Sequence, residues 1–154
     1  LSIYLLYIMS NKNVDTKKTK IMVFGAFDGL HPGHIDFFKQ AKNLAENSFL
    51  IVSVARDKNI IKIKGEKPML SENERLILVE KNKFVDKIVM AGKIKYLPHI
   101  LKEKPDLIAL GYDQKDYVQE LKKDLKDKGI LIKIVRLKPF KKEIYKNHLL
   151  KIKR

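Results

Sequence analysis

The chain has 154 residues, a hydrophobic content of 45%, no cysteine and a formal net charge of +15 at pH 7. This composition is sufficient for one domain with a real core, and the lack of cysteine excludes a disulfide framework, a thiolate metal site and a cysteine nucleophile. A cysteine-free chain suits a reducing compartment, so we expect a cytoplasmic protein. The positive charge favours anionic partners: nucleic acid, acidic lipid or phosphorylated metabolites.

The first residues form an apolar stretch, "LSIYLLYIM", followed by a polar segment. The stretch is about half as long as the roughly 20 residues that a membrane-spanning helix needs, and no small-residue cleavage pattern follows it. We expect residues 1–19 to be a disordered or flexible leader without a membrane partner, with Met9 as a candidate start. An interfacial anchor is the alternative. Residues 20–154 then form the folded domain.

Five short apolar or β-branched runs predict strands that are buried on both faces. They cover residues 20–25, 49–55, 86–91, 106–111 and 130–137. Helical patterns lie between them. The first helix begins after residue 31 and buries Phe37, Phe38, Ala41, Leu44 and Ala45. A second helix covers residues 71–82, with a capping box at Ser71 and Glu74, and a short helical segment over 94–104 is broken by Pro98. A helix over 115–129 ends at Gly129, and a basic helix covers residues 143–153.

Alternating strands and helices predict an α/β domain with a five-stranded parallel sheet and helices on both faces. Ligands of such sheets bind at the carboxyl ends of the strands, where the strand order reverses. Residues 25–34 follow the first predicted strand, and Gly111, Tyr112 and Asp113 follow the fourth. We therefore expect both segments to reach the same crevice.

The segment "FGAFDGLHPGH", residues 24–34, carries the clearest chemical signal. Pro32 suits the first turn of a helix, where its missing N–H costs nothing, so His31 is expected to cap that helix. The free amides and the positive dipole end of a helix N-terminus favour an anion, and Gly33 lets phosphate oxygens approach the backbone. His31 and His34 project to the same side of the turn and can both donate to phosphate oxygens. The segment predicts a phosphate cradle.

Two other interpretations of this segment stay open. The histidines could bind a metal ion, but no third ligand lies at a helpful spacing, so we expect no metal site built from protein ligands alone. They could also fill polar positions at a strand–helix corner, in which case Gly25, Pro32 and Gly33 would have no evident purpose.

The motif "GAFDGLHPGH" resembles the "GTFDxxHxGH" signature of the Rossmann-like nucleotidyltransferases. Within that superfamily, "VARDKNIIKIKGEKPMLSENER" (54–75) and "KPDLIALGYDQ" (104–114) resemble the archaeal FAD synthases. The resemblance implies transfer of AMP from ATP to FMN, which gives FAD and pyrophosphate with a divalent metal, usually Mg²⁺. It also implies a homodimer.

The same resemblance implies roles for individual residues. His31 and His34 would hold the triphosphate and stabilise the pentavalent α-phosphorus as catalytic residues. The other nucleotide-binding residues that it implies are Gly25, Ala26, Phe27, Pro32, Gly33, Asp113 and Tyr145.

Three basic residues are candidates for the acceptor phosphate or the leaving pyrophosphate. Lys64 and Lys67 lie in the glycine-containing stretch "KIKGEKP", which we expect to be a loop, and Arg75 follows the cap of the second predicted helix. The alternatives are solvated lysines and a structural pair between Arg75 and Glu72.

The chain departs from the family pattern at two places. Ala26 stands where the signature has threonine, which removes a hydroxyl but keeps the backbone amide. The stretch "EIYKNHLLKIKR" replaces a serine- and threonine-rich phosphate-binding segment. There Asn147 can still cap a helix and Lys146 brings positive charge.

Two alternative functions remain. A cytidylyltransferase acting on glycerol 3-phosphate or a similar phosphorylated alcohol would use the same first motif. A noncatalytic nucleic-acid-binding module would need basic side chains gathered with stacking aromatics. The lysines instead spread along the whole chain, so we expect no nucleic-acid partner.

Overall fold

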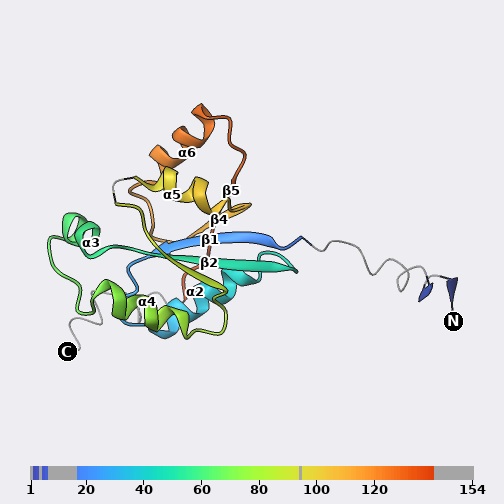
Figure 1. Cartoon of the computed structure of the whole chain (residues 1–154), viewed down its shortest axis with the longest axis horizontal. Helices are drawn as coiled ribbons and strands as arrows, with labels where there is room; N and C mark the ends of the chain where they lie inside the picture. The colour runs from blue at the N-terminus through green and yellow to red at the C-terminus, as the bar shows by residue number, and fades with distance from the viewer. Residues whose placement is uncertain (1, 4, 7–16, 94, 141–154) are drawn as a thin grey trace.

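A computed structural model describes residues 2, 3, 5, 6, 17–93 and 95–140 of the chain. The core is a parallel sheet of five strands in the order β3-β2-β1-β4-β5 (Figure 1). The strands are β1 (Thr19–Gly25), β2 (Ser48–Val54), β3 (Lys87–Met90), β4 (Leu107–Leu110) and β5 (Lys133–Arg136). All five predicted strands are confirmed, and four of them are shorter than or shifted from the apolar runs by one to several residues.

The helices lie in the connections between strands. They are α2 (Pro32–Lys42), α3 (Asp57–Lys64), α4 (Glu72–Glu80), α5 (Tyr96–Glu103) and α6 (Val118–Asp127). The predicted capping box of α4 is present, since Ser71 Oγ accepts from the Glu74 N–H and the Glu74 carboxylate accepts from the Ser71 N–H. The end of α6 is also as predicted, because Gly129 follows it with φ of 65°.

Each face of the sheet packs against its own pair of helices. Successive strand residues point to opposite faces. Ile21 and Val23 of β1 therefore pack with α2 and α4 on one face, whereas Met22 and Phe24 pack with α5 and α6 on the other. Figure 1 shows these two helical layers below and above the sheet. The predicted α/β fold with helices on both faces is confirmed.

Two helix predictions were wrong. The helix α3 was not predicted; it has 8 residues and is capped at its C-terminus by Gly65, whose φ is 74°. Pro98 does not break its helix, because it is the third residue of α5, where a backbone N–H would have no partner within the helix. The predicted basic helix over 143–153 lies outside the described residues, as does most of the predicted leader.

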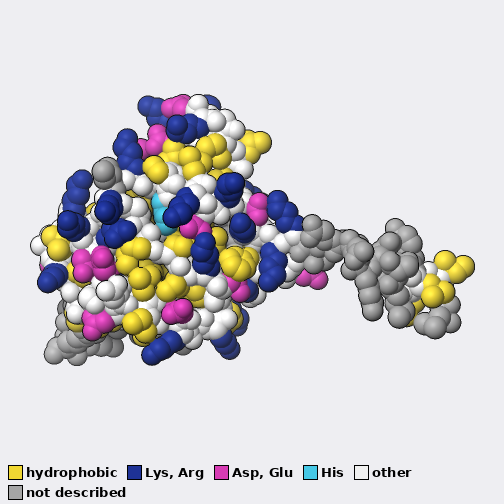
Figure 2. Space-filling model, viewed as in Figure 1, with side chains coloured by type: hydrophobic (Ala, Val, Ile, Leu, Met, Phe, Trp, Pro, Cys, Tyr) yellow, Lys and Arg dark blue, Asp and Glu magenta, His cyan; other side chains and the backbone are white. Residues whose placement is uncertain are grey.

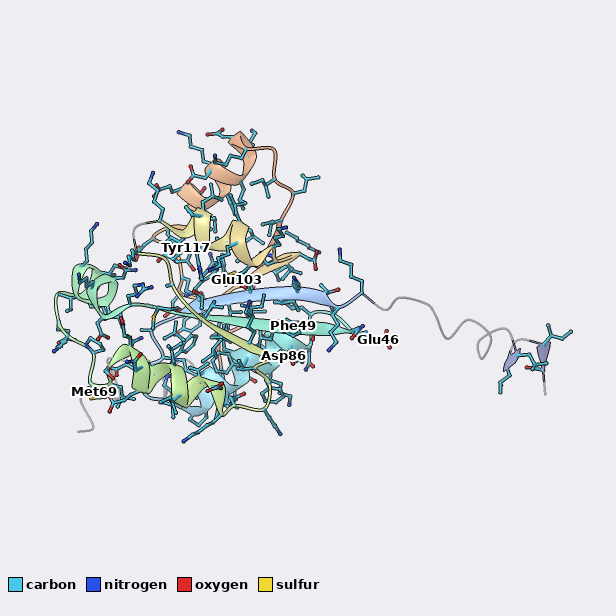
Figure 3. All side chains as sticks on the ribbon, in the orientation of Figure 1. Glu46, Phe49, Met69, Asp86, Glu103 and Tyr117 are labelled. Carbon is cyan, nitrogen blue, oxygen red and sulfur yellow. The ribbon has the colours of Figure 1, made fainter. Side chains whose placement is uncertain are left out.

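Lysine and arginine side chains spread over the face of the molecule seen in Figure 2 without gathering in one patch. Within the described ranges, no helix has both the length and the apolar content to cross a membrane. Among the side chains labelled in Figure 3, Glu46, Phe49 and Asp86 lie near the amino ends of β2 and β3. Met69, in the connection between α3 and α4, lies toward the carboxyl ends of the strands.

Candidate active site

The two histidines of the motif form the start of α2. His31 is the N-cap, with its Nδ1 accepting from the backbone N–H groups of Gly33 (3.1 Å) and His34 (3.3 Å). His34 Nδ1 in turn accepts from the N–H of His31 at 3.4 Å, so the pair forms a reciprocal capping box. The rings stack with centroids 3.7 Å apart. Pro32 occupies the first helical position, as predicted.

This capping arrangement fixes the tautomer of both neutral rings. Because each Nδ1 accepts a hydrogen bond, the ring proton must be on Nε2. Burial lowers the pKa of His34 to about 4, with a further contribution from His31, while a hydrogen bond to the Gly29 backbone acts in the opposite direction. His34 is therefore a neutral N–H donor at neutral pH, suited to a growing negative charge without carrying a charge itself.

Phe27 packs against His34 at the start of α2. Its backbone is in the left-handed region, with φ of 52°, and its side chain is buried. The Phe27 ring lies nearly perpendicular to the His34 ring, with ring centroids 5.4 Å apart, and packs against Phe38 with ring centroids 5.1 Å apart. A Cβ on Gly25 would lie 2.5 Å from the Phe27 ring. The absence of a side chain at Gly25 therefore leaves room for the Phe27 ring, which packs against His34.

A cleft of about 1040 Å³ opens at the carboxyl ends of the strands. It is lined by Gly25, Ala26, Phe27, His31, Gly33 and His34 from the β1–α2 segment, and by Gly111, Tyr112 and Asp113 after β4. Because β1 and β4 are neighbours at the point where the strand order reverses, the prediction that the two segments share one crevice is confirmed.

The side chains of Gln114 and Arg136 hold the segment after β4 in place. Gln114 accepts from the Gly111 N–H at 2.8 Å and donates to the carbonyl of Phe24 at 2.9 Å, which joins the ends of β4 and β1. Arg136 donates to the carbonyls of Gly111 and Gln114, both at 2.8 Å. The Asp113 carboxylate is therefore presented at the cleft by a fixed turn.

The three basic acceptor candidates lie in different environments. Lys64 lines the cleft, but as the last residue of α3 and not in a loop. Lys67 is exposed and does not line the cleft. Tyr145, the last of the predicted nucleotide-binding residues, lies outside the described residues.

The burial of Arg75 contradicts its predicted role as a phosphate ligand in the cleft. Its side chain is fully buried and is not part of the cleft lining, and its ion-pair partner is Asp57 and not Glu72. The guanidinium donates to the carbonyls of Ala26 (2.8 Å) and Ala55 (2.7 Å) and to the carboxylate of Asp57 (2.7 Å). It thereby ties the segment after β1 to the segment after β2.

The motif carboxylate has a similar structural role. Asp28 accepts from the backbone N–H groups of Met69 and Leu70, both at 2.8 Å. Since residues 69–70 lead directly into the cap of α4, Asp28 fixes the motif to the start of that helix.

The sequence analysis missed much of the cleft lining. Ser53, Asn59 and Tyr96 reach it from β2, α3 and the start of α5. Five lysines that were not predicted also line it, namely Lys62, Lys93, Lys95, Lys115 and Lys138, and so does the carboxylate of Asp116. A signal for α3 was present, because the lysine-rich end of "DKNIIKIK" precedes a glycine.

The donor set suits a divalent cation that arrives with a nucleotide. Among residues 17–93 and 95–140, no group of three or more His, Cys, Asp or Glu side chains could hold a metal ion. Mg²⁺ needs only one or two carboxylates when substrate phosphates supply its other ligands. Asp113 and Asp116 are the carboxylates on the cleft wall, so the residues fit such an ion.

Comparison with known proteins agrees with this geometry. Residues 22–149 match the Cytidylyltransferase-like family. The chain is 39% identical over 121 residues to an FAD synthase from Aciduliprofundum boonei, which covers 79% of each chain. It is 42% identical over 122 residues to the FAD synthase of Korarchaeum cryptofilum, which covers 79% of this chain and 82% of that one.

Solved structures show the same fold. A crystal structure from Thermoplasma volcanium, described as a lipopolysaccharide core biosynthesis protein, superposes with a TM-score of 0.74 at 37% identity, covering 80% of this chain and 99% of that chain. A pantoate-beta-alanine ligase from Francisella tularensis superposes with a TM-score of 0.52 at 20% identity, covering 99% of this chain and 74% of that one. The second likeness concerns the fold alone.

Proposed function

The chain belongs to the cytidylyltransferase-like family, with the archaeal FAD synthases among its relatives, and we propose that it transfers AMP from ATP to FMN, forming FAD and pyrophosphate. The observation that carries this proposal is the pair of stacked histidines at the N-terminus of α2, facing a cleft shared with the "GYDQ" turn.

In the proposed reaction, a phosphate oxygen of FMN attacks the α-phosphorus of ATP. The bond between that phosphorus and the oxygen leading to the β-phosphate breaks, and pyrophosphate leaves in line with the attacking oxygen. The protein mainly positions the two substrates and balances charge. His31 and His34 donate through their Nε2–H groups to the triphosphate, where negative charge grows in the transition state, and the positive dipole end of α2 also favours that charge.

The remaining nucleotide contacts follow the same arrangement. Ala26 and Phe27 offer backbone groups beside the nucleotide, and Asp113 meets the adenosine side. Lys64, at the end of α3, approaches the acceptor phosphate or the leaving pyrophosphate. We assign Lys67 no contact in this arrangement, because its exposed side chain is not part of the cleft lining.

We further propose Mg²⁺ as the divalent ion, which the triphosphate and Asp116 would hold. When bound, it neutralises charge on the transferring and leaving phosphates. We also propose a cytoplasmic homodimer that binds neither nucleic acid nor membrane, which sedimentation analysis and binding to RNA and to lipid vesicles would test.

The proposed function is tested with two nucleotides and two acceptors. Purified protein and Mg²⁺ are incubated with ATP or CTP and with FMN or glycerol 3-phosphate, and the products are separated by chromatography. We expect FAD from ATP plus FMN and no product from CTP plus glycerol 3-phosphate. The opposite pattern would make the chain a cytidylyltransferase.

A further inference from the structure

The central strand β1 separates two halves of the cleft lining. The half after β4 contains the "GYDQ" turn, which the proposed function assigns to adenosine. The other half, the acceptor half, is formed by the ends of β2 and β3 and by α3, and includes Ser53, Asn59 and Gly92. Tyr96 lies where this half meets the first, since it stacks on Tyr117 of the segment after β4. The total volume is at the upper limit of the roughly 300–1,000 Å³ of a pocket for one small ligand, as expected where two nucleotides meet.

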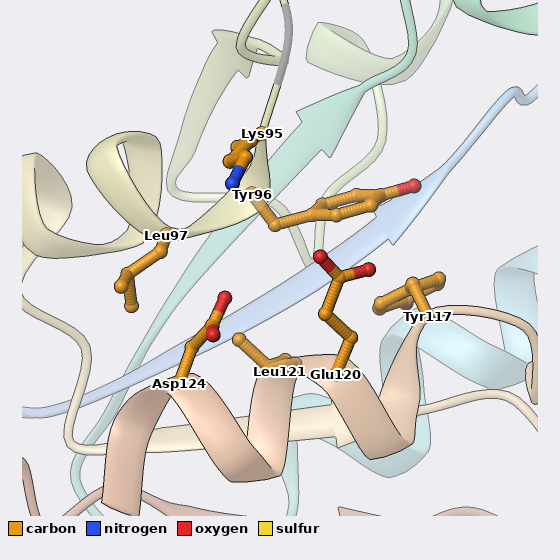
Figure 4. A pocket seen from close by; sticks show the side chains of 7 residues that line it. All are labelled: Lys95, Tyr96, Leu97, Tyr117, Glu120, Leu121 and Asp124. Carbon is orange, nitrogen blue, oxygen red and sulfur yellow. The ribbon is translucent and has the colours of Figure 1, made fainter. Parts of the chain in front are cut away.

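Tyr96, the first residue of α5, supplies an aromatic ring to the acceptor half. It stacks on Tyr117 with centroids 4.3 Å apart and an interplanar angle of 21°. The Phe24 ring lies beside the pair and nearly perpendicular to both rings, with its centroid 5.8 Å from that of Tyr96 and 6.2 Å from that of Tyr117. Figure 4 shows the two tyrosines among the side chains that line a small hollow of about 100 Å³ between α5 and α6. The Tyr96 ring is thus half-buried and fixed in orientation.

Hydrogen bonds hold the start of α5 in place. His99, one turn after Tyr96, is hydrogen-bonded through Nε2 to Ser53 Oγ at 2.9 Å. Asn59 of α3 donates to the carbonyl of Gly92 at 3.1 Å. A Cβ on Gly92 would lie 2.8 Å from the carbonyl oxygen of Lys95, so the connection packs closely there. A platform held in this way loses little conformational freedom when a ligand stacks on it.

We propose that Tyr96 is the stacking platform for the isoalloxazine ring of FMN, in the acceptor half of the cleft. The inference rests on the proposed transfer of AMP to FMN. A flat aromatic ring gains from stacking on a fixed aromatic side chain, whereas a phosphorylated alcohol such as glycerol 3-phosphate has no surface to place there.

The test compares the wild type with Tyr96→Leu and Tyr96→Phe. The Leu variant removes the ring, and the Phe variant keeps it and serves as the matched control. FMN binding is followed by flavin fluorescence with the uncleavable analogue α,β-methylene-ATP present, and calorimetry measures binding of that analogue and of ribitol 5-phosphate, an acceptor fragment without the ring. Thermal unfolding verifies that the variants are folded.

We expect Tyr96→Leu to weaken FMN binding at least about fivefold, the low end of the range for losing one stacking partner. The Phe variant should stay within about twofold of wild type. Binding of the ATP analogue and of ribitol 5-phosphate should be unchanged in both variants, because neither ligand contacts the platform.

Four outcomes overturn the inference. Equal weakening of all three ligands by Tyr96→Leu would make Tyr96 a structural support only. Weaker binding of the ATP analogue alone would assign the platform to adenine. Unchanged FMN binding in a protein that forms FAD would overturn this inference and leave the proposed function standing, whereas a wild type that forms no FAD would overturn both.

Discussion

At the scale of single residues, His34 caps a helix and faces the cleft, and substitution separates these two roles. His34→Ala removes the ring donor, so turnover with ATP and FMN should fall by at least about 100-fold, the scale for one oxyanion-type donor. His34→Gln is the matched control, because glutamine can keep the capping box and retains an N–H donor. It should keep more activity than the Ala variant. Unchanged turnover in His34→Ala would remove the histidine from the mechanism.

The pKa of His34 also predicts how stability depends on pH. The value falls from 6.5 to about 4 on folding, so between these values the unfolded chain binds more protons than the folded one. The stabilising contribution is complete above pH 6.5 and is lost as the pH falls toward 4. Urea unfolding across this window should therefore show a steeper loss of unfolding free energy in the wild type than in His34→Gln. Parallel curves for the two proteins would contradict the lowered pKa.

Arg75 predicts a large loss of stability on substitution. Arg75→Met leaves Asp57 and two strand-end carbonyls without their buried donor, which should cost about 3–5 kcal/mol of unfolding free energy. Arg56→Met is the control, because Arg56 lies 3.9 Å from Glu72 and is about one-third exposed, with a side-chain exposure of 30%. It should cost no more than about 1–2 kcal/mol in urea unfolding. Equal losses in the two variants would contradict the buried network.

These residues mark the limit of prediction from the sequence at this scale. His31, Pro32 and His34 lie within one turn of helix, so their spacing sufficed to predict the cap and the shared side of the two rings. The partners of Arg75 are carbonyls at residues 26 and 55, brought to it only by the folded sheet. The sequence shows its charge and not its burial, which is why Arg75 was assigned to a phosphate.

At the scale of the elements, the end of β1 leaves no room for a side chain. Gly25→Ala would place a Cβ 2.5 Å from the Phe27 ring and should cost about 1–3 kcal/mol of unfolding free energy. The equivalent glycine after β4 is the matched control, since a Cβ on Gly111 has its nearest contact at 3.4 Å, with Gln114 Oε1, which is an ordinary van der Waals distance. Gly111→Ala should cost less than about 1 kcal/mol. Similar costs, measured by urea unfolding, would contradict the close packing of Phe27.

The elements also differ in how far the sequence predicts them. Continuous apolar runs identified all five strands, because both faces of this sheet are covered by helices. The helix α3 was missed because its 8 residues have one buried position, Ile60, and so show no inward stripe. In α5, the proline was taken as a break, although in the first turn of a helix it removes no hydrogen bond.

At the scale of the whole molecule, the alternation of strands and helices was enough to predict the parallel sheet and the edge at which the site lies. It could not predict the order β3-β2-β1-β4-β5 or which side chains reach the cleft from β3 and α5. Tyr96 and Tyr117 are 21 residues apart in sequence, and only the packing of α5 beside α6 brings their rings together.

In the proposed reaction of the whole molecule, the α-phosphorus of ATP is transferred directly, with its adenosine, to FMN. The most direct measurement incubates the protein with FMN and with ATP that carries radioactive phosphorus at the α-position, and then separates protein, FAD and pyrophosphate. We expect every FAD formed to carry the label and the pyrophosphate to carry none. Label in the pyrophosphate, label bound covalently to the protein as an intermediate, or no labelled FAD would contradict the account.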